Sequence, residues 1–234
     1  MLSSWYTQDA DEIVAPPTGE ILMEIYNLLF TAFGPQNWWP ADTDLEMMIG
    51  AILTQNTSWS NVEKAIQNLK EKDLVSIKGL SETPAPILAE YIRPAGYYNL
   101  KARRLKNLIS LIEDKHDGDL NSLFSLHTDR IRKELLSVQG IGLETADSMI
   151  LYGAQRALFV VDTYSHRILS RHGLIEEEAG YFEVQMLFMD TLPHDVELFK
   201  EFHALLVKTG KGFCRRKPLC PGCPLEKVNR EAEV

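Results

Sequence analysis

The sequence predicts an all-α protein built from many short helices. Apolar residues recur three and four positions apart along most of the chain, which places them on one face of a helix. No alternating run long enough for a half-buried strand occurs, and the β-branched patch at Leu158–Val161 is too short to form one. Proline and glycine interrupt the helical pattern repeatedly, so each helix is expected to be short.

The expected helices follow one another with short breaks between them. Helical spacing is found in the segments Ile21–Leu29, Leu45–Leu53, Ser60–Leu69, Leu105–Ile112, Ile131–Val138, Ala146–Gly153 and Tyr181–Leu192. Breaks are expected at Pro16-Pro17, Pro35–Pro40, Pro84–Pro86, Arg93-Pro94 and Gly173.

Length and composition exclude several classes of protein. With 234 residues and 45% apolar composition, the chain can form one large domain or two small ones. No stretch approaches the roughly 20 apolar residues that span a bilayer. Met1–Ala15 is polar and acidic, unlike a signal peptide. We therefore expect a cytoplasmic protein that does not bind a membrane.

The formal net charge of −9 argues against a non-specific polycation, but two segments are basic. They are Arg93–Lys106 and Lys208–Lys217, with five lysines or arginines in each. They are either solvated faces or the positive surface that a nucleic acid needs.

A glycine pair separates two helical patterns. One helix is expected to end at Ser137 and the next to begin near Leu143, which leaves Val138–Gly142 as a tight reversal. Gly140, Ile141 and Gly142 can present backbone N–H groups to a phosphate beside the positive end of the second helix. The alternative is a helix corner that binds nothing.

Three further motifs occur with this hairpin. They are V-V-D-T-Y-S-H-R-I from Val160, A-I-L-T-Q-N-T from Ala51 and G-Y-Y-N-L-K-A from Gly96. Together they resemble the helix-hairpin-helix (HhH-GPD) DNA glycosylases of the endonuclease III superfamily. The resemblance implies a two-lobed fold, with a helical barrel at residues 40–156 and a second lobe of residues 1–39 and 157–234.

The resemblance also implies the chemistry. Asp162 matches the family's catalytic aspartate, and a carboxylate near C1′ stabilises the cation that forms as a base leaves. Its rival role is to cap the following helix. Glu144 stands where bifunctional members have a lysine, and a glutamate cannot form a Schiff base. We therefore expect a monofunctional glycosylase without lyase activity, in which Glu144 serves as a helix first-turn charge.

A flipped nucleotide leaves a gap that the protein must fill. By motif match, Gln55 fills the gap and Tyr97 is the wedge of a second loop, and Tyr98, Asn99 and Lys101 complete the DNA-binding set. Gln55 and Asn99 could instead cap their helices.

Aromatic residues narrow the substrate. Trp38, Trp39, Pro40 and Trp59 resemble the bacterial 3-methyladenine DNA glycosylase III branch, which holds its base between aromatic rings; Tyr164 is a weaker candidate for the pocket. Indole faces attract a cationic base such as 3-methyladenine. Each tryptophan could equally be a core residue.

All three cysteines lie near the C-terminus, at Cys214, Cys220 and Cys223. The spacing resembles the family's [4Fe–4S] loop, but the fourth cysteine would fall at Asn229. A cluster with an unknown fourth ligand, a zinc site and a loop that has lost its metal all remain open.

The expected activity is therefore excision of alkylated purines from damaged double-stranded DNA during base excision repair. We expect the protein to act as a monomer associated with the nucleoid. The alternatives are a glycosylase for oxidised pyrimidines or mismatches, and a DNA-binding module without catalysis.

Overall fold

The computed structural model describes residues 18–228, and these contain helices and no strand. The predicted all-α class is therefore confirmed. The helices are α1 (Thr18–Phe33), α2 (Asp44–Leu53), α3 (Trp59–Lys70), α4 (Ile77–Glu82), α5 (Ala85–Tyr91), α6 (Tyr98–His116), α7 (Leu120–Phe124), α8 (Thr128–Leu136), α9 (Leu143–Ser148), α10 (Thr163–Arg171), α11 (Tyr181–Thr191) and α12 (Val196–Gly212). A 3₁₀ turn, η1, covers Arg93–Ala95, and a π-helical turn, η2, covers Met149–Gly153.

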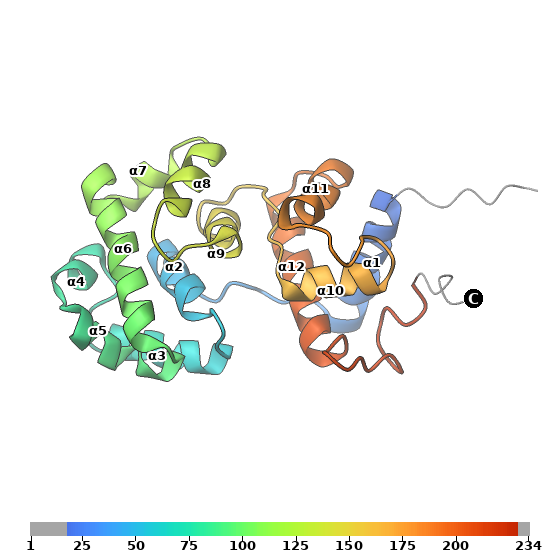
Figure 1. Cartoon of the computed structure of the whole chain (residues 1–234), viewed down its shortest axis with the longest axis horizontal. Helices are drawn as coiled ribbons and strands as arrows, with labels where there is room; N and C mark the ends of the chain where they lie inside the picture. The colour runs from blue at the N-terminus through green and yellow to red at the C-terminus, as the bar shows by residue number, and fades with distance from the viewer. Residues whose placement is uncertain (1–17, 229–234) are drawn as a thin grey trace, which may run out of the picture.

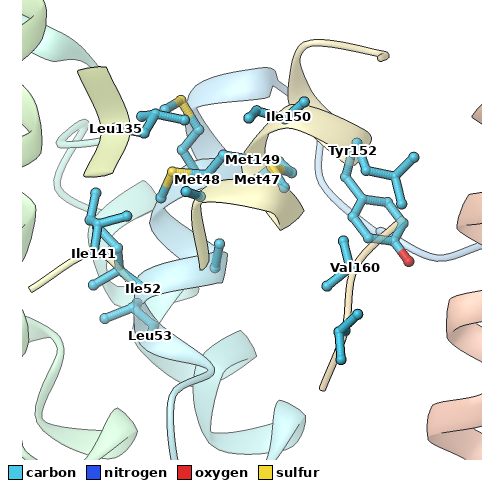
Figure 2. Packing of buried hydrophobic residues seen from close by; sticks show 14 of the residues in the cluster. Met47, Met48, Ile52, Leu53, Leu135, Ile141, Met149, Ile150, Tyr152 and Val160 are labelled. Carbon is cyan, nitrogen blue, oxygen red and sulfur yellow. The ribbon is translucent and has the colours of Figure 1, made fainter. Parts of the chain in front are cut away.

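Helix α2 is the centre of the first group of helices. Every residue from Glu46 to Leu53 is buried, because α3, α6, α9 and η2 all pack against α2. This explains why the sequence of α2 is apolar all round rather than on one face. Figure 2 shows Met47 and Met48 of α2 beside Met149 of η2, which follows α9 directly.

The second group joins segments far apart in the sequence. Helix α12 packs against α10 and α1, and α11 also packs against α1. Stacked phenylalanine rings fill the space between them, with Phe159 and Phe188 3.5 Å apart at their centroids and Phe199 and Phe202 edge-on to Phe159.

Figure 1 shows α2–α9 on one side of the molecule and α1 with α10–α12 on the other. Residues 34–43 and 154–162 connect the two groups. The predicted lobe boundaries near residues 40 and 156 fall within these connections. Met1–Ala15, the segment that differs from a signal peptide, lies outside the described residues. No described helix is long and apolar enough to cross a membrane.

Helix α12 was not predicted from the sequence. Its signals are an aspartate cap, in which the Asp195 carboxylate accepts the Leu198 N–H at 2.8 Å, and buried residues at helical spacing. Helix α12 is important for the site because it carries a histidine that faces the predicted catalytic aspartate.

Candidate active site and nucleic-acid interface

The glycine hairpin forms where the sequence predicts it. Helix α8 ends at Leu136 and α9 begins at Leu143. Ile141 is buried and anchors the hairpin in the core (Figure 2). Within residues 18–228, the Gly140 and Gly142 N–H groups donate no hydrogen bond. They are therefore free to bind an anion such as a phosphate.

Arg104 lies directly against the hairpin. Gly140 has φ +99°, and a Cβ added there would lie 2.5 Å from Cγ of Arg104. The Arg104 guanidinium passes over the glycine and donates to Oε1 of Gln55. Glycine is required at 140 both for its backbone angle and for this close approach.

Gly140→Ala is expected to lower the free energy of unfolding by about 1–3 kcal/mol, from backbone strain and displacement of Arg104. Gly142 is the matched control, because a Cβ added at Gly142 would have no neighbour within 4 Å and its φ is −98°. Gly142→Ala should change stability by no more than about 0.5 kcal/mol. Urea unfolding of both variants tests this, and equal losses would contradict it.

Gln55 is held by two elements of the first group. Its side-chain amide donates to Oγ1 of Thr145 on α9 at 2.7 Å, and its oxygen accepts from Arg104 on α6. Gln55 therefore does not cap α2, whose C-cap is Thr54. The predicted gap-filling residue is joined to both the hairpin helix and the arginine that covers the hairpin.

Tyr97 is the most exposed of the predicted DNA-contacting aromatics. Tyr97 is 71% exposed, and it has the left-handed angles φ 45° and ψ 32°, which are uncommon for a bulky residue. Backbone of this kind occurs at ligand-binding sites more often than elsewhere. Asn99 is also exposed and makes no capping bond, because Tyr97 occupies the N-cap of α6. Tyr98 is half-buried and stacks on Arg93.

Lys101 occupies a different place from the predicted DNA contact. It is 1% exposed, and its ammonium group donates to Leu53 O and Ala95 O at 2.8 Å and to Thr57 Oγ1 at 3.0 Å. Burial, with the Arg104 charge nearby, lowers the pKa of Lys101 to about 8. Lys101 thus ties the Gln55 loop to the Tyr97 loop from inside the protein.

The basic segment around Lys101 is only partly a surface. Lys106 donates to the carbonyl oxygens of Leu80 and Thr83 at 3.0 Å, and Arg104 donates to Gln55. This segment is therefore neither wholly a solvated face nor wholly a DNA-binding surface, because part of its positive charge is bonded within the protein. In the second segment, Arg215, Arg216 and Lys217 are exposed.

The three predicted pocket tryptophans meet. Ring centroids are 4.6 Å apart for Trp38 and Trp59, 4.9 Å for Trp38 and Trp39, and 5.6 Å for Trp39 and Trp59. Trp38 and Trp59 touch edge-on, whereas a base between two parallel rings needs them about 7 Å apart, twice a van der Waals contact. The pair must separate to hold a base. Pro40 is exposed beside them.

Trp39 is the most firmly packed of the three. Its indole lies over Gly50 of α2, and its ring centroid is 5.5 Å from that of Tyr152 on η2. Its buried Nε1 has no hydrogen-bond partner among the described residues. Tyr164, the weaker pocket candidate, packs instead against Gly210 of α12, with Arg167 and Lys211 over its ring.

Asp162 divides its two carboxylate oxygens between roles. Oδ1 accepts the backbone N–H groups of Tyr164 at 2.9 Å and Ser165 at 2.7 Å, and so caps α10. Oδ2 takes no part in the cap and lies 3.6 Å from Nε2 of His203. The capping role and a chemical role are therefore compatible in one side chain.

The electrostatic surroundings keep Asp162 ionised. Burial by itself raises the pKa of Asp162, but His203 and the bonds from Ser165 outweigh it and bring the pKa below its usual value. Glu144 is exposed, but partial desolvation by the neighbouring protein, together with the Asp162 charge, raises the pKa of Glu144. The pKa values of the two carboxyl groups therefore shift in opposite directions.

A buried network supports the segment that precedes Asp162. Asp147 on α9 is fully buried, and its Oδ2 accepts from Arg132 at 2.6 Å, Tyr181 at 2.7 Å and Gln185 at 2.8 Å. Gln185 also donates to Phe159 O at 2.6 Å. This network connects the first group of helices to α11 and to the chain leading into the aspartate.

The cysteines do not present a complete ligand set. Cys214 is buried with its sulfur 3.3 Å from Nη1 of Arg171, Cys223 is half-buried and Cys220 is exposed. Burial raises the pKa of the Cys223 thiol. No group of three or more His, Cys, Asp or Glu side chains within residues 18–228 is arranged to hold a metal ion. The described thiols do not fit a four-thiolate cluster, and Asn229 lies outside the described residues.

Sequence reasoning missed four residues of this site. They are Arg104 and Thr145, which hold Gln55, and Tyr152 and His203, which lie between Trp39 and Asp162. Thr145 lies one residue after Glu144, and Arg104 is marked in the sequence only as part of a basic segment.

Comparisons with known proteins identify a matching family model and a similar sequence. The family model described as "HhH-GPD superfamily base excision DNA repair protein" matches residues 49–194. The "Putative DNA repair glycosylase MJ1434" of Methanocaldococcus jannaschii is 48% identical over 210 residues, covering 89% of this chain and 95% of its own.

Two solved structures have the same fold. One is the 3-methyladenine DNA glycosylase MagIII of H. pylori bound to 1,N6-ethenoadenine, with 29% identity and a TM-score of 0.72, covering 84% of this chain and 98% of that one. The other is an endonuclease III–DNA complex, with 24% identity and a TM-score of 0.78, covering 92% of this chain and 97% of that one.

Proposed function

The chain belongs to the HhH-GPD superfamily of base excision DNA repair proteins, and on that premise we propose that it is a monofunctional glycosylase for alkylated purines, 3-methyladenine foremost. DNA glycosylase activity in base excision repair follows from the family. The choice of base and the absence of strand cleavage are the proposed parts.

The observation that carries the proposal is the tryptophan trio joined to Asp162. Trp39 contacts Tyr152, the Tyr152 hydroxyl lies 2.8 Å from His203 Nδ1, and His203 faces Asp162. An alkylated purine such as 3-methyladenine is cationic, and indole faces attract a cation by about 0.5–2 kcal/mol. Similarity to the H. pylori 3-methyladenine glycosylase supports the same choice.

Catalysis in this proposal depends on charge stabilisation by Asp162. As the glycosidic bond breaks, positive charge develops on the deoxyribose, and Oδ2 of Asp162 is the oxygen free to stabilise it. The same oxygen can accept a proton from the attacking water. The free N–H groups of Gly140 and Gly142 bind a phosphate, and Gln55 and Tyr97 occupy the gap left by the flipped nucleotide.

Glu144 supports the monofunctional assignment. It lies on the first turn of α9, close enough to Asp162 and His203 to interact with both charges. A lysine at this place can attack C1′ and form an imine, but a carboxylate cannot. The proposed product is therefore free base and an abasic site in an intact strand.

The test is incubation with methylated duplex DNA, followed by analysis of released bases and of strand breaks. We expect free 3-methyladenine, nicks only after alkali, and no covalent adduct on borohydride treatment. An adduct would contradict the monofunctional assignment. Release only from oxidised or mismatched duplexes would contradict the alkylpurine assignment and leave the glycosylase family unchanged.

A further inference from the structure

His203 is a buried histidine with ionisable partners on both sides of its ring. It lies on α12 and is 6% exposed. Nδ1 lies 2.8 Å from the Tyr152 hydroxyl, and Nε2 lies 3.6 Å from Oδ2 of Asp162. Nε2 is buried and makes no hydrogen bond within 3.5 Å among the described residues. A buried ring nitrogen without a bond is costly unless it faces a charge, and here it faces a carboxylate.

The hydrogen positions follow from the Tyr152 hydroxyl, which has one proton to donate. If this proton goes to His203 Nδ1, the neutral ring carries its own proton on Nε2, directed at Asp162. If it goes to Lys200 O, 3.2 Å away, Nδ1 must donate to the hydroxyl oxygen. A lone pair on Nε2 would then face the carboxylate, which is an unfavourable contact. The first arrangement, which directs the Nε2–H of His203 toward Oδ2, fits the observed geometry better.

The ionisable groups around His203 belong to four elements. Asp162 precedes α10, Glu144 lies on α9, Tyr152 lies on η2 and Glu201 lies on α12. Burial raises the pKa of Tyr152, and the charges of Asp162 and Glu201 raise it further. After desolvation, the charge of Asp162 is the next cause that raises the pKa of Glu144, whereas His203 lowers it, so removing the histidine leaves the repulsion between Asp162 and Glu144 unopposed.

We propose that His203 is the positioning residue for Asp162, holding Oδ2 ionised and oriented while Oδ1 caps α10. Tyr152 sets the orientation of the imidazole. Tyr152 also contacts Trp39, so the base pocket is connected to the carboxylate through Tyr152 and His203. The inference rests on the proposed role of Asp162 in base release. It adds α12 to the catalytic site, although none of the family motifs lies in the sequence of α12.

The first experiment is the pH dependence of single-turnover base release from methylated duplex DNA. In His203→Gln, the imidazole that faces Oδ2 and lowers the pKa of Asp162 is replaced by an amide, so Asp162 should protonate at higher pH. The acid limb of the rate profile is expected to move up by about one pH unit, the scale of shift expected when a stabilising neighbour of a carboxylate is removed. Tyr152→Phe should move it in the same direction by less. If the role of His203 is purely structural, the variant should release base more slowly but with an unmoved acid limb. That result would overturn the proposal.

The matched control is His116→Gln. His116 is equally buried at 6% exposed and pairs with Glu134 at 2.9 Å, but it lies between α6 and α8. His116→Gln is expected to leave the acid limb in place, because the buried histidine–carboxylate pair that it removes lies outside the proposed catalytic site. An equal shift in this variant would overturn the proposal.

A second readout needs no substrate. Carbon-13 NMR of the carboxyl group of Asp162 in the free protein follows its titration directly, in the full chain and in His203→Gln. A higher midpoint in the variant supports the pairing even if methylated DNA proves not to be the substrate. An unchanged midpoint overturns the inference, whereas no base release by the wild-type protein counts against the proposed function alone.

Discussion

Asp162→Asn is expected to reduce the single-turnover rate of base release by about two to four orders of magnitude. The amide carries no charge to stabilise the developing cation and accepts no proton from water. Asparagine is also a good helix N-cap, so the bonds that Oδ1 accepts from Tyr164 and Ser165 can persist. The loss is therefore expected in the chemical step, with DNA binding retained.

Fluorescence anisotropy with a damaged duplex, together with thermal unfolding, separates these effects. The variant should bind within a fewfold of wild type and unfold at a similar temperature. Full base release by Asp162→Asn would remove the catalytic assignment and leave Asp162 as a helix cap. Glu144 would then be the next carboxyl group to test, because the charge of Asp162 acts on it.

Asp147→Ala is expected to lower the free energy of unfolding by about 3–5 kcal/mol, the range for breaking a buried ion pair by removing one partner. Arg132, with 19% of its side chain exposed, would lose its partner, and Tyr181 and Gln185 would each lose an acceptor. Burial raises the pKa of Asp147, so this carboxylate depends on those donors to stay ionised.

Asp129→Ala provides the control on the neighbouring helix α8. Its side chain is 93% exposed and lies 3.7 Å from His127, so its removal should change stability by no more than about 0.5 kcal/mol. Urea unfolding at neutral pH compares the two variants. Similar small losses would mean that the Asp147 network contributes little to the connection between the two groups of helices.

Most of the helices could be predicted because their buried residues recur at a helical period. The reversal between Ser137 and Leu143 could be predicted too, because two glycines lie between two helical patterns. Helix α12 was not predicted, although Asp195 and the apolar spacing after it contained the signal. Motif resemblance predicted that Trp38, Trp39 and Trp59 belong to one base pocket, and the three rings do meet.

Lys101 shows where sequence reasoning reached its limit. A lysine in a basic segment beside an exposed tyrosine indicates a phosphate contact, and nothing local distinguishes that from a buried ammonium. Its three acceptors come from residues up to 48 positions away in the chain. The same applies to Arg104, whose contact with Gln55 spans 49 positions.

The sequence by itself determined the helical class, the hairpin, the family and the identity of the groups available for chemistry, because each depends on residue type and short-range spacing. Only the tertiary structure decided which atoms of those groups are available for chemistry. It divided the Asp162 oxygens between a cap and His203, placed Glu144 in the same site, and turned Lys101 inward. Hydrogen bonding, burial and charge are set by neighbours in space, and those neighbours come from helices far apart in the chain.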